Sequence, residues 1–106
     1  MNKRIKISDK PTEGLTASVL NTEIDKLRDR DAYLLHNINW QDKGFDMYAG
    51  MHTQLLKLAK QGDEDCIEMV AIAKRLHELN AEIKARTGES YSHLPKGFKP
   101  RTSYRK

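Results

Sequence analysis

Residues 63–88 have the pattern of one long helix, and that helix restricts the chain to folds that cover its apolar face. Asp63 is suited to cap the N-terminus, and Gly88 follows the last turn as a stop. Between them, apolar residues recur at three- and four-residue spacing, as expected for one face of a helix: Cys66, Met69, Val70, Ala73, Leu76, Leu79 and Ile83. A stripe of this kind needs partner helices, and the preceding sequence predicts two.

The first partner helix is predicted from Thr16 to Ile38, with Thr16 as its N-cap and Asp31 where a further apolar residue is expected. Its stripe comprises Leu20, Ile24, Leu27, Leu34 and Ile38. The second is predicted to start at Trp40 or Asp42, after an asparagine-rich break, and to end at Gln61 before Gly62. Its stripe comprises Tyr48, Met51, Leu55 and Leu58.

Three helices joined by short turns predict an all-α fold, a small three-helix bundle with an up-down-up path over residues 15–88. The length of 106 residues suits one such domain. Residues 1–14 are interpreted as an extended basic N-terminal arm. Residues 89–106 are interpreted as an extended basic tail, because proline, glycine and serine recur there. We expect deletion of this tail to leave thermal stability nearly unchanged, since it offers little apolar area.

The charge of the chain is concentrated at its ends. The formal net charge is +4 and the isoelectric point is near 9.2. Residues 1–10 carry +3, residues 11–88 carry −3, and residues 89–106 carry +4. An acidic body between two basic ends is the most informative functional feature of the sequence.

The basic ends favour a non-enzymatic protein that binds nucleic acid or a nucleoprotein. Cations neutralise phosphates, and aromatic side chains stack on unpaired bases, so single-stranded or structured RNA is the favoured ligand. The candidate binding residues are Lys3, Arg4, Lys6, Lys96, Phe98, Lys99, Arg101, Tyr104, Arg105 and Lys106. Two other interpretations of the tail stay open: it is a solubilising terminus, or it contacts an acidic surface, including that of its own body.

A second functional hypothesis concerns the predicted middle helix, which has more large apolar residues than one stripe can bury. Trp40, Phe45 and Met47 are candidates for a protein interface on that helix. The chain would then be a small adaptor or inhibitor, of the kind encoded by phages or mobile elements, and a homodimer is compatible with this hypothesis. The competing interpretation is that a central helix is surrounded by core and buries these side chains.

No motif points to catalysis, a metal or a cofactor. His36, His52, His77 and His93 lack the spacing that places two ligands on one helix face, and Cys66 is expected to be a buried core residue. We therefore expect a protein that is not an enzyme and needs no cofactor or metal. No apolar run approaches the roughly 18 residues of a membrane span, and no secretory signal is evident. These features predict a cytoplasmic protein without a membrane partner.

Overall fold

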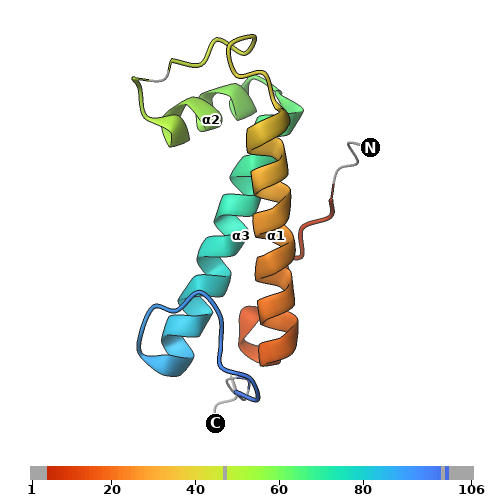
Figure 1. Cartoon of the computed structure of the whole chain (residues 1–106), viewed down its shortest axis with the longest axis vertical. Helices are drawn as coiled ribbons and strands as arrows, with labels where there is room; N and C mark the ends of the chain where they lie inside the picture. The colour runs from red at the N-terminus through yellow and green to blue at the C-terminus, as the bar shows by residue number, and fades with distance from the viewer. Residues whose placement is uncertain (1–4, 47, 99, 101–106) are drawn as a thin grey trace.

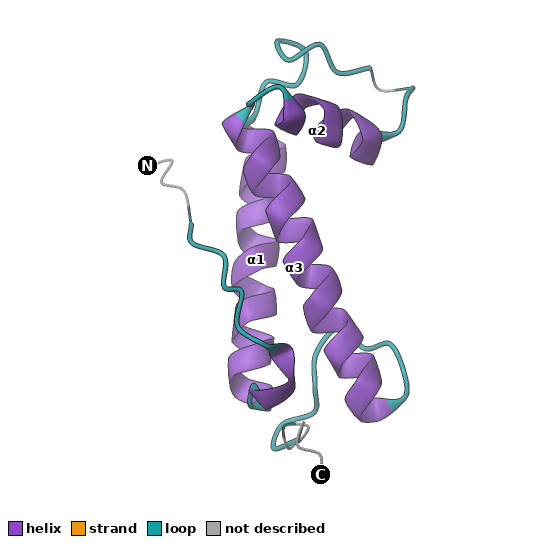
Figure 2. Cartoon of the chain, turned by 180° about the vertical axis from the view of Figure 1, so that it is seen from behind, coloured by secondary structure: helices purple, strands orange, loops and turns teal. Residues whose placement is uncertain are grey.

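Two long helices lie side by side, and a short third helix crosses one end of the pair (Figures 1 and 2). The computed structural model describes residues 5–46, 48–98 and 100. The long helices are α1 (Ala17–Asn37) and α3 (Glu64–Thr87), and the short one is α2 (Met51–Lys60). A 3-10 turn, η1 (Thr12–Gly14), precedes α1. All regular elements in the described part of the chain are helical and pack on one another, so the predicted all-α, three-helix fold is confirmed.

The path of the chain differs from the predicted up-down-up order. Later positions on α1 pair with earlier positions on α3: Glu23 binds Arg75, and Arg30 binds Glu68. The two long helices are therefore antiparallel, whereas an up-down-up path would make them parallel. The reason is the connection, because the described residues between α1 and α2, 38–46 and 48–50, contain no α-helix, and α2 is only 10 residues long. The chain crosses the top of the pair instead of travelling its length.

The core lies between α1 and α3 and continues under α2. Leu20, Ile24, Leu27 and Leu34 of the predicted first stripe are buried. On α3, Ile72 is fully buried although it lies off the predicted stripe, while Ala73, placed on that stripe, is exposed. The buried part of the cluster comprises Ala17, Leu20, Ile24, Leu27, Leu34, Leu55, Cys66, Met69, Ile72, Leu79, Ile83 and Leu94.

The helix ends on α1 and α3 follow the sequence prediction. The Thr16 hydroxyl accepts a hydrogen bond from the Val19 amide at 3.2 Å, and the Asp63 carboxylate accepts one from the Cys66 amide at 3.0 Å. Gly88 ends α3 in the left-handed conformation, with φ of 80°. Side chains with a β-carbon adopt this conformation at a cost, which explains the glycine.

The predicted start of the second helix is wrong. Residues 40–46 and 48–50 form turns and loop, and α2 begins only at Met51. The Trp40 indole N–H donates to the Leu35 carbonyl at 2.9 Å, at the end of α1 where helix carbonyls lack helical partners. Its ring meets that of Phe45 edge-on, with centroids 4.6 Å apart. Gly44, with φ of 77°, turns the backbone between the two rings.

The first part of the predicted tail is packed against the helices. Leu94 is 3% exposed and belongs to the core, and Phe98 packs against it. The Asn21 side chain accepts from the Leu94 amide at 2.8 Å and donates to the Leu94 carbonyl at 2.9 Å. The expectation that this segment contributes little buried apolar area is therefore wrong.

The N-terminal arm also lies on the body. Ile5 and Ile7 are half-buried against the core. Figure 2 shows the arm crossing the face of the α1/α3 pair that points away from the viewer in Figure 1. It forms no strand within the described residues. The arm is instead held by side chains of α3.

We expect Leu94→Ala to lower the free energy of unfolding by about 2–5 kcal/mol, the usual cost of emptying a buried leucine site. Urea unfolding monitored by circular dichroism measures it. Leu56→Ala is the matched control because Leu56 is exposed on α2, and it should cost under about 1 kcal/mol. Equal losses at the two leucines would contradict the packing of the tail.

Candidate functional site

The main polar feature of the structure is a row of ion pairs between α1 and α3. Glu23 and Arg30 lie seven residues apart on α1. Glu68, Arg75 and Glu82 repeat at the same interval on α3, with alternating sign. Because a seven-residue step returns to nearly the same side of a helix, these charges line the seam between the helices.

The Arg30–Glu68 pair is the most deeply enclosed cross-helix pair of this row. The guanidinium donates from Nε to Glu68 Oε2 at 2.6 Å and from Nη2 to Oε1 at 3.0 Å. The two side chains are 9% and 5% exposed. Such a bidentate geometry fits the planar fork of arginine to the carboxylate. Arg30 also lies over the Tyr33 ring, 5.3 Å from its centroid.

Arg75 binds Glu23 in the same bidentate way, at 2.6 Å and 3.2 Å, and reaches Glu78 at 3.1 Å. The hydrogen bonds that Arg75 donates to Glu23 are the main reason that the Arg75 pKa is raised, outweighing the lowering effect of burial. At the lower end of α3, the Arg86 Nε donates to Glu82 at 2.7 Å. Each of these arginines is thereby neutralised inside the body.

The same charged side chains hold the N-terminal arm in place. Glu68 accepts from the Ile5 amide at 3.4 Å, and Arg75 donates to the Lys10 carbonyl at 2.9 Å. Arg86 donates to the Thr12 carbonyl at 2.9 Å. The ion pairs therefore position a stretch of backbone, and they are structural in function.

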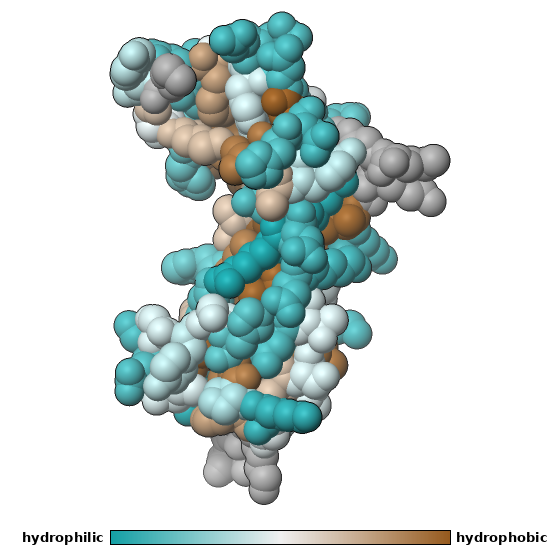
Figure 3. Space-filling model, viewed as in Figure 1, coloured by the Kyte–Doolittle hydropathy of each residue, from teal (hydrophilic) through white to brown (hydrophobic). Residues whose placement is uncertain are grey.

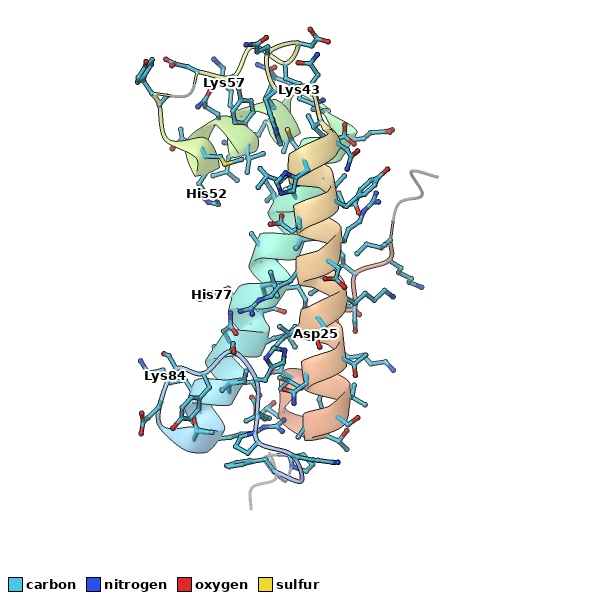
Figure 4. The ribbon with its side chains drawn as sticks, in the orientation of Figure 1. Asp25, Lys43, His52, Lys57, His77 and Lys84 are labelled. Carbon is cyan, nitrogen blue, oxygen red and sulfur yellow. The ribbon has the colours of Figure 1, made fainter. Side chains whose placement is uncertain are left out.

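A separate cluster joins the loop to the start of α3. Lys43 Nζ binds the carboxylates of Asp63 at 2.6 Å and Asp65 at 3.5 Å. The Asp63 hydrogen bond raises the pKa of Lys43. Burial acts to raise the pKa of Asp63, but hydrogen bonds from Lys43 and the Cys66 amide outweigh it, so that pKa is lowered. Lys43 thus fixes the loop to the N-terminus of α3, near Lys57 of α2 (Figure 4).

Cys66 is fully buried, which confirms the expectation of a core cysteine. Burial, reinforced by the negative charge of Asp63, raises the pKa of its thiol to about 11. A thiol with this pKa is almost entirely protonated at neutral pH, and only the thiolate is an effective nucleophile.

The histidines do not come together. His52 on α2 and His77 on α3 are separated along the molecule (Figure 4), and both are exposed. His93 Nε2 lies 2.6 Å from Asp25 Oδ1 and ties the tail to α1. No group of three or more histidine, cysteine, aspartate or glutamate side chains in residues 5–46, 48–98 and 100 is arranged to hold a metal ion. None of the helices in this part of the chain has the length and apolar character to cross a membrane.

The residues predicted to bind nucleic acid fall into three groups: exposed, half-buried, and outside the described part of the chain. Lys6 on the arm and Lys96 on the tail are exposed, whereas Phe98 is half-buried against the core. Phe98 therefore has less ring surface available for stacking than predicted. The remaining predicted residues lie outside the described part of the chain: Lys3, Arg4, Lys99, Arg101, Tyr104, Arg105 and Lys106.

The predicted protein interface is not on a helix. Trp40 and Phe45 pack on each other in the loop before α2, partly buried, and Met47 lies outside the described residues. The exposed apolar residues near α2 differ from the predicted interface residues. Tyr48 is 93% exposed, and Met51 and Leu56 are also exposed. Hydrophobic surface is visible over α2 at the top of Figure 3.

Sequence reasoning missed the buried charges and the residue that anchors the tail. A usable signal existed for the buried charges, because Glu68, Arg75 and Glu82 keep a strict seven-residue interval along α3. For Asn21 and Leu94 no local signal existed, since their contact joins positions 73 residues apart. Comparisons with protein-family models, with curated proteins and with solved structures find no match for this chain.

We expect Arg30→Met to lower the free energy of unfolding by about 3–5 kcal/mol, because it leaves a buried carboxylate without its arginine. Adding Glu68→Met should recover most of that loss, since two apolar side chains then fill the site. Urea denaturation of the single and double variants measures the coupling. Exposed Lys74→Met is the control, with a cost under about 0.5 kcal/mol. A double variant as unstable as the sum of the single variants would contradict a buried, coupled pair.

Proposed function

We propose that this chain is a non-enzymatic nucleic-acid-binding protein whose basic ends contact the phosphates, with the C-terminal tail as the main contact. Single-stranded or structured RNA is the preferred ligand. The observation that carries the proposal is the division of charge between the body and the ends.

The body has no surplus of positive charge. Residues in the described part of the chain include 13 of the 19 basic residues and all 15 acidic residues. Arg30, Arg75 and Arg86 are committed to carboxylates in the interior. The six further cations all belong to the terminal segments, at Lys3, Arg4, Lys99, Arg101, Arg105 and Lys106. An attractive field for phosphates therefore originates at the ends of the chain.

The anchor at Leu94 supports a role for the tail. Leu94 and its two hydrogen bonds to Asn21 fix the backbone two residues before Lys96, the first cation of the C-terminal cluster. A segment that is tethered next to its binding residues loses less conformational freedom when it binds. The body would thus serve as a rigid base for the cationic tail.

The two ends leave the body on opposite sides, which limits how they act together. The arm lies beside Val19, Glu23 and Lys26 of α1, whereas the tail contacts Asn21 and Asp25. At 3.6 residues per turn these two sets face nearly opposite directions. A short strand would therefore bind one end, and a longer ligand would have to pass around the body.

Binding to a labelled single-stranded RNA should weaken with salt. Each phosphate contact contributes about −0.7 to the slope of log affinity against log salt, so the five tail cations set a limit near −3.5. Arg101→Ala with Arg105→Ala should reduce the magnitude of the slope by about 1.4. Tyr104→Ala should lower affinity by about 1–3 kcal/mol at constant slope, because stacking releases no counterions. Fluorescence anisotropy across a salt series measures all three.

The matched control is Lys57→Ala with Lys60→Ala, which removes two cations from α2 and should leave the slope unchanged. If no binding is seen near physiological salt at tens of micromolar protein, the nucleic-acid proposal is wrong. An equal effect of the α2 control and the arginine pair would mean that net charge, and not the tail, drives binding.

A second function, binding of a protein partner, is favoured by the exposed apolar residues at the α2 end. Tyr48, Met51 and Leu56 are candidates for this surface, replacing the predicted Trp40 and Phe45, which are partly buried. Tyrosine and methionine are enriched at protein interfaces. The chain would then be an adaptor or inhibitor.

Affinity purification from the native host, with and without nuclease, separates the two functions. Partners of the α2 surface should persist after nuclease treatment and be lost with Met51→Asp and Leu56→Asp, since a charge in an apolar contact is strongly unfavourable. Partners that vanish with nuclease and are retained by these variants would contradict the second function and favour the first.

A further inference from the structure

A groove of about 680 Å³ runs between the N-terminal arm and α1, and its base is aliphatic. Ile7, Leu15 and Val19 line it, together with the buried Leu27. Val19 is 51% exposed, although it lies on a helix directly beside the arm. The arm therefore covers the apolar surface of α1 incompletely, and the groove has room for aliphatic side chains of a partner.

The edge of this groove is positively charged. Lys6, Lys10 and Lys26 line it and are exposed. The acidic side chains on the groove are Asp9 and Glu23, and Glu23 is bound in a bidentate pair by Arg75. Three lysines thus line the groove together with one carboxylate, Asp9, for which the described residues show no ion pair, so the groove favours an acidic occupant.

The arm is extended, and part of its backbone makes no hydrogen bonds within the described residues. Backbone amides and carbonyls of residues 6–9 make no hydrogen bond with any other residue in the described ranges. The ends of this stretch are fixed, because Glu68 binds the Ile5 amide and Arg75 binds the Lys10 carbonyl. An extended segment held in place with free backbone groups is the element to which another chain adds as a strand.

From these three features we infer that the groove between the arm and α1 is a docking site for an extended, acidic segment of another protein that carries aliphatic side chains. The segment pairs with the backbone of residues 6–9, places its aliphatic side chains over Val19, and directs its carboxylates to Lys6, Lys10 and Lys26. This surface is distinct from the tail and does not depend on nucleic-acid binding.

Other occupants fit the groove less well. A second copy of this chain would place its own Lys6 and Lys10 against like charges, which is unfavourable for directly opposed strands. A nucleic acid would find no aromatic side chain among the residues that line the groove, so its bases would have no stacking surface. The groove on the other side of the arm has no lysine or arginine among the residues that line it, so it does not favour an acidic segment.

The experiment uses the whole protein and a fluorescein-labelled peptide of about ten residues in which glutamate and valine alternate. We expect this peptide to bind, and peptides of alternating lysine and valine or of alternating glutamate and serine to bind at least about tenfold more weakly. A version of the first peptide with N-methyl groups on alternate residues should also lose about tenfold in affinity, because it lacks the amides needed for strand pairing.

Two pairs of exposed-site variants locate the docking surface. Lys26→Glu and Val19→Asn should each weaken binding about tenfold. Their controls, Lys74→Glu and Ile67→Asn, alter exposed residues of α3 outside this groove and should change affinity by less than about twofold. Circular dichroism confirms that each variant is folded.

The inference is overturned if the glutamate–valine peptide fails to bind at about millimolar concentration, or if the controls weaken binding as much as Lys26→Glu and Val19→Asn. It is also overturned if a labelled oligothymidine binds with the same dependence on Val19 and Lys26, because the groove would then be a nucleic-acid surface. The tail double variant, Arg101→Ala with Arg105→Ala, should leave peptide binding unchanged, which separates this site from the proposed nucleic-acid contact.

Discussion

The row of charges between α1 and α3 is the constraint on which the rest of the structure depends. Arg30–Glu68 and Glu23–Arg75 fix the two helices in an antiparallel register, because a shift of one turn would leave buried charges without partners. A polar or charged residue at a seam position specifies the register of paired helices more strictly than apolar side chains do. The same side chains then bind the backbone of the arm at Ile5 and Lys10. One set of interactions thus determines both the helix pairing and the course of the N-terminus.

Local patterns in the sequence predicted the structural features that depend on residues close to one another in the chain. The caps at Thr16 and Asp63 and the end of α3 at Gly88 are local features, and all three are confirmed. The start of α2 was not predictable from periodicity, because Tyr48 lies on the same apolar stripe as Met51 and Leu55 although it precedes the helix. Trp40 and Phe45 lie further back in the loop and pack on each other. The Trp40 indole binds the Leu35 carbonyl at the end of α1, five residues earlier, and this capping contact leaves no mark in the apolar periodicity.

The candidate functional surfaces were predicted less completely than the fold. Counting charge along the sequence identifies the basic ends, but it does not show that Arg30, Arg75 and Arg86 are used internally. The groove along α1 depends on where the arm lies, and that position is set by contacts such as Ile5 with Glu68, 63 residues apart. Lys26 on a helix and Lys6 on an arm are unrelated in the sequence and become one surface only in the structure.

The contact between Asn21 and Leu94 has a consequence for how the C-terminal segment behaves. The Asn21 amide group offers one donor and one acceptor to a single backbone unit, as a neighbouring strand would. The buried Leu94 side chain, the His93–Asp25 contact and the packing of Phe98 add selectivity. The segment therefore acts as an intramolecular ligand for α1, and its covalent connection gives it a high effective concentration. A competing chain with an exposed aliphatic residue would have to overcome that local concentration before it could displace the segment.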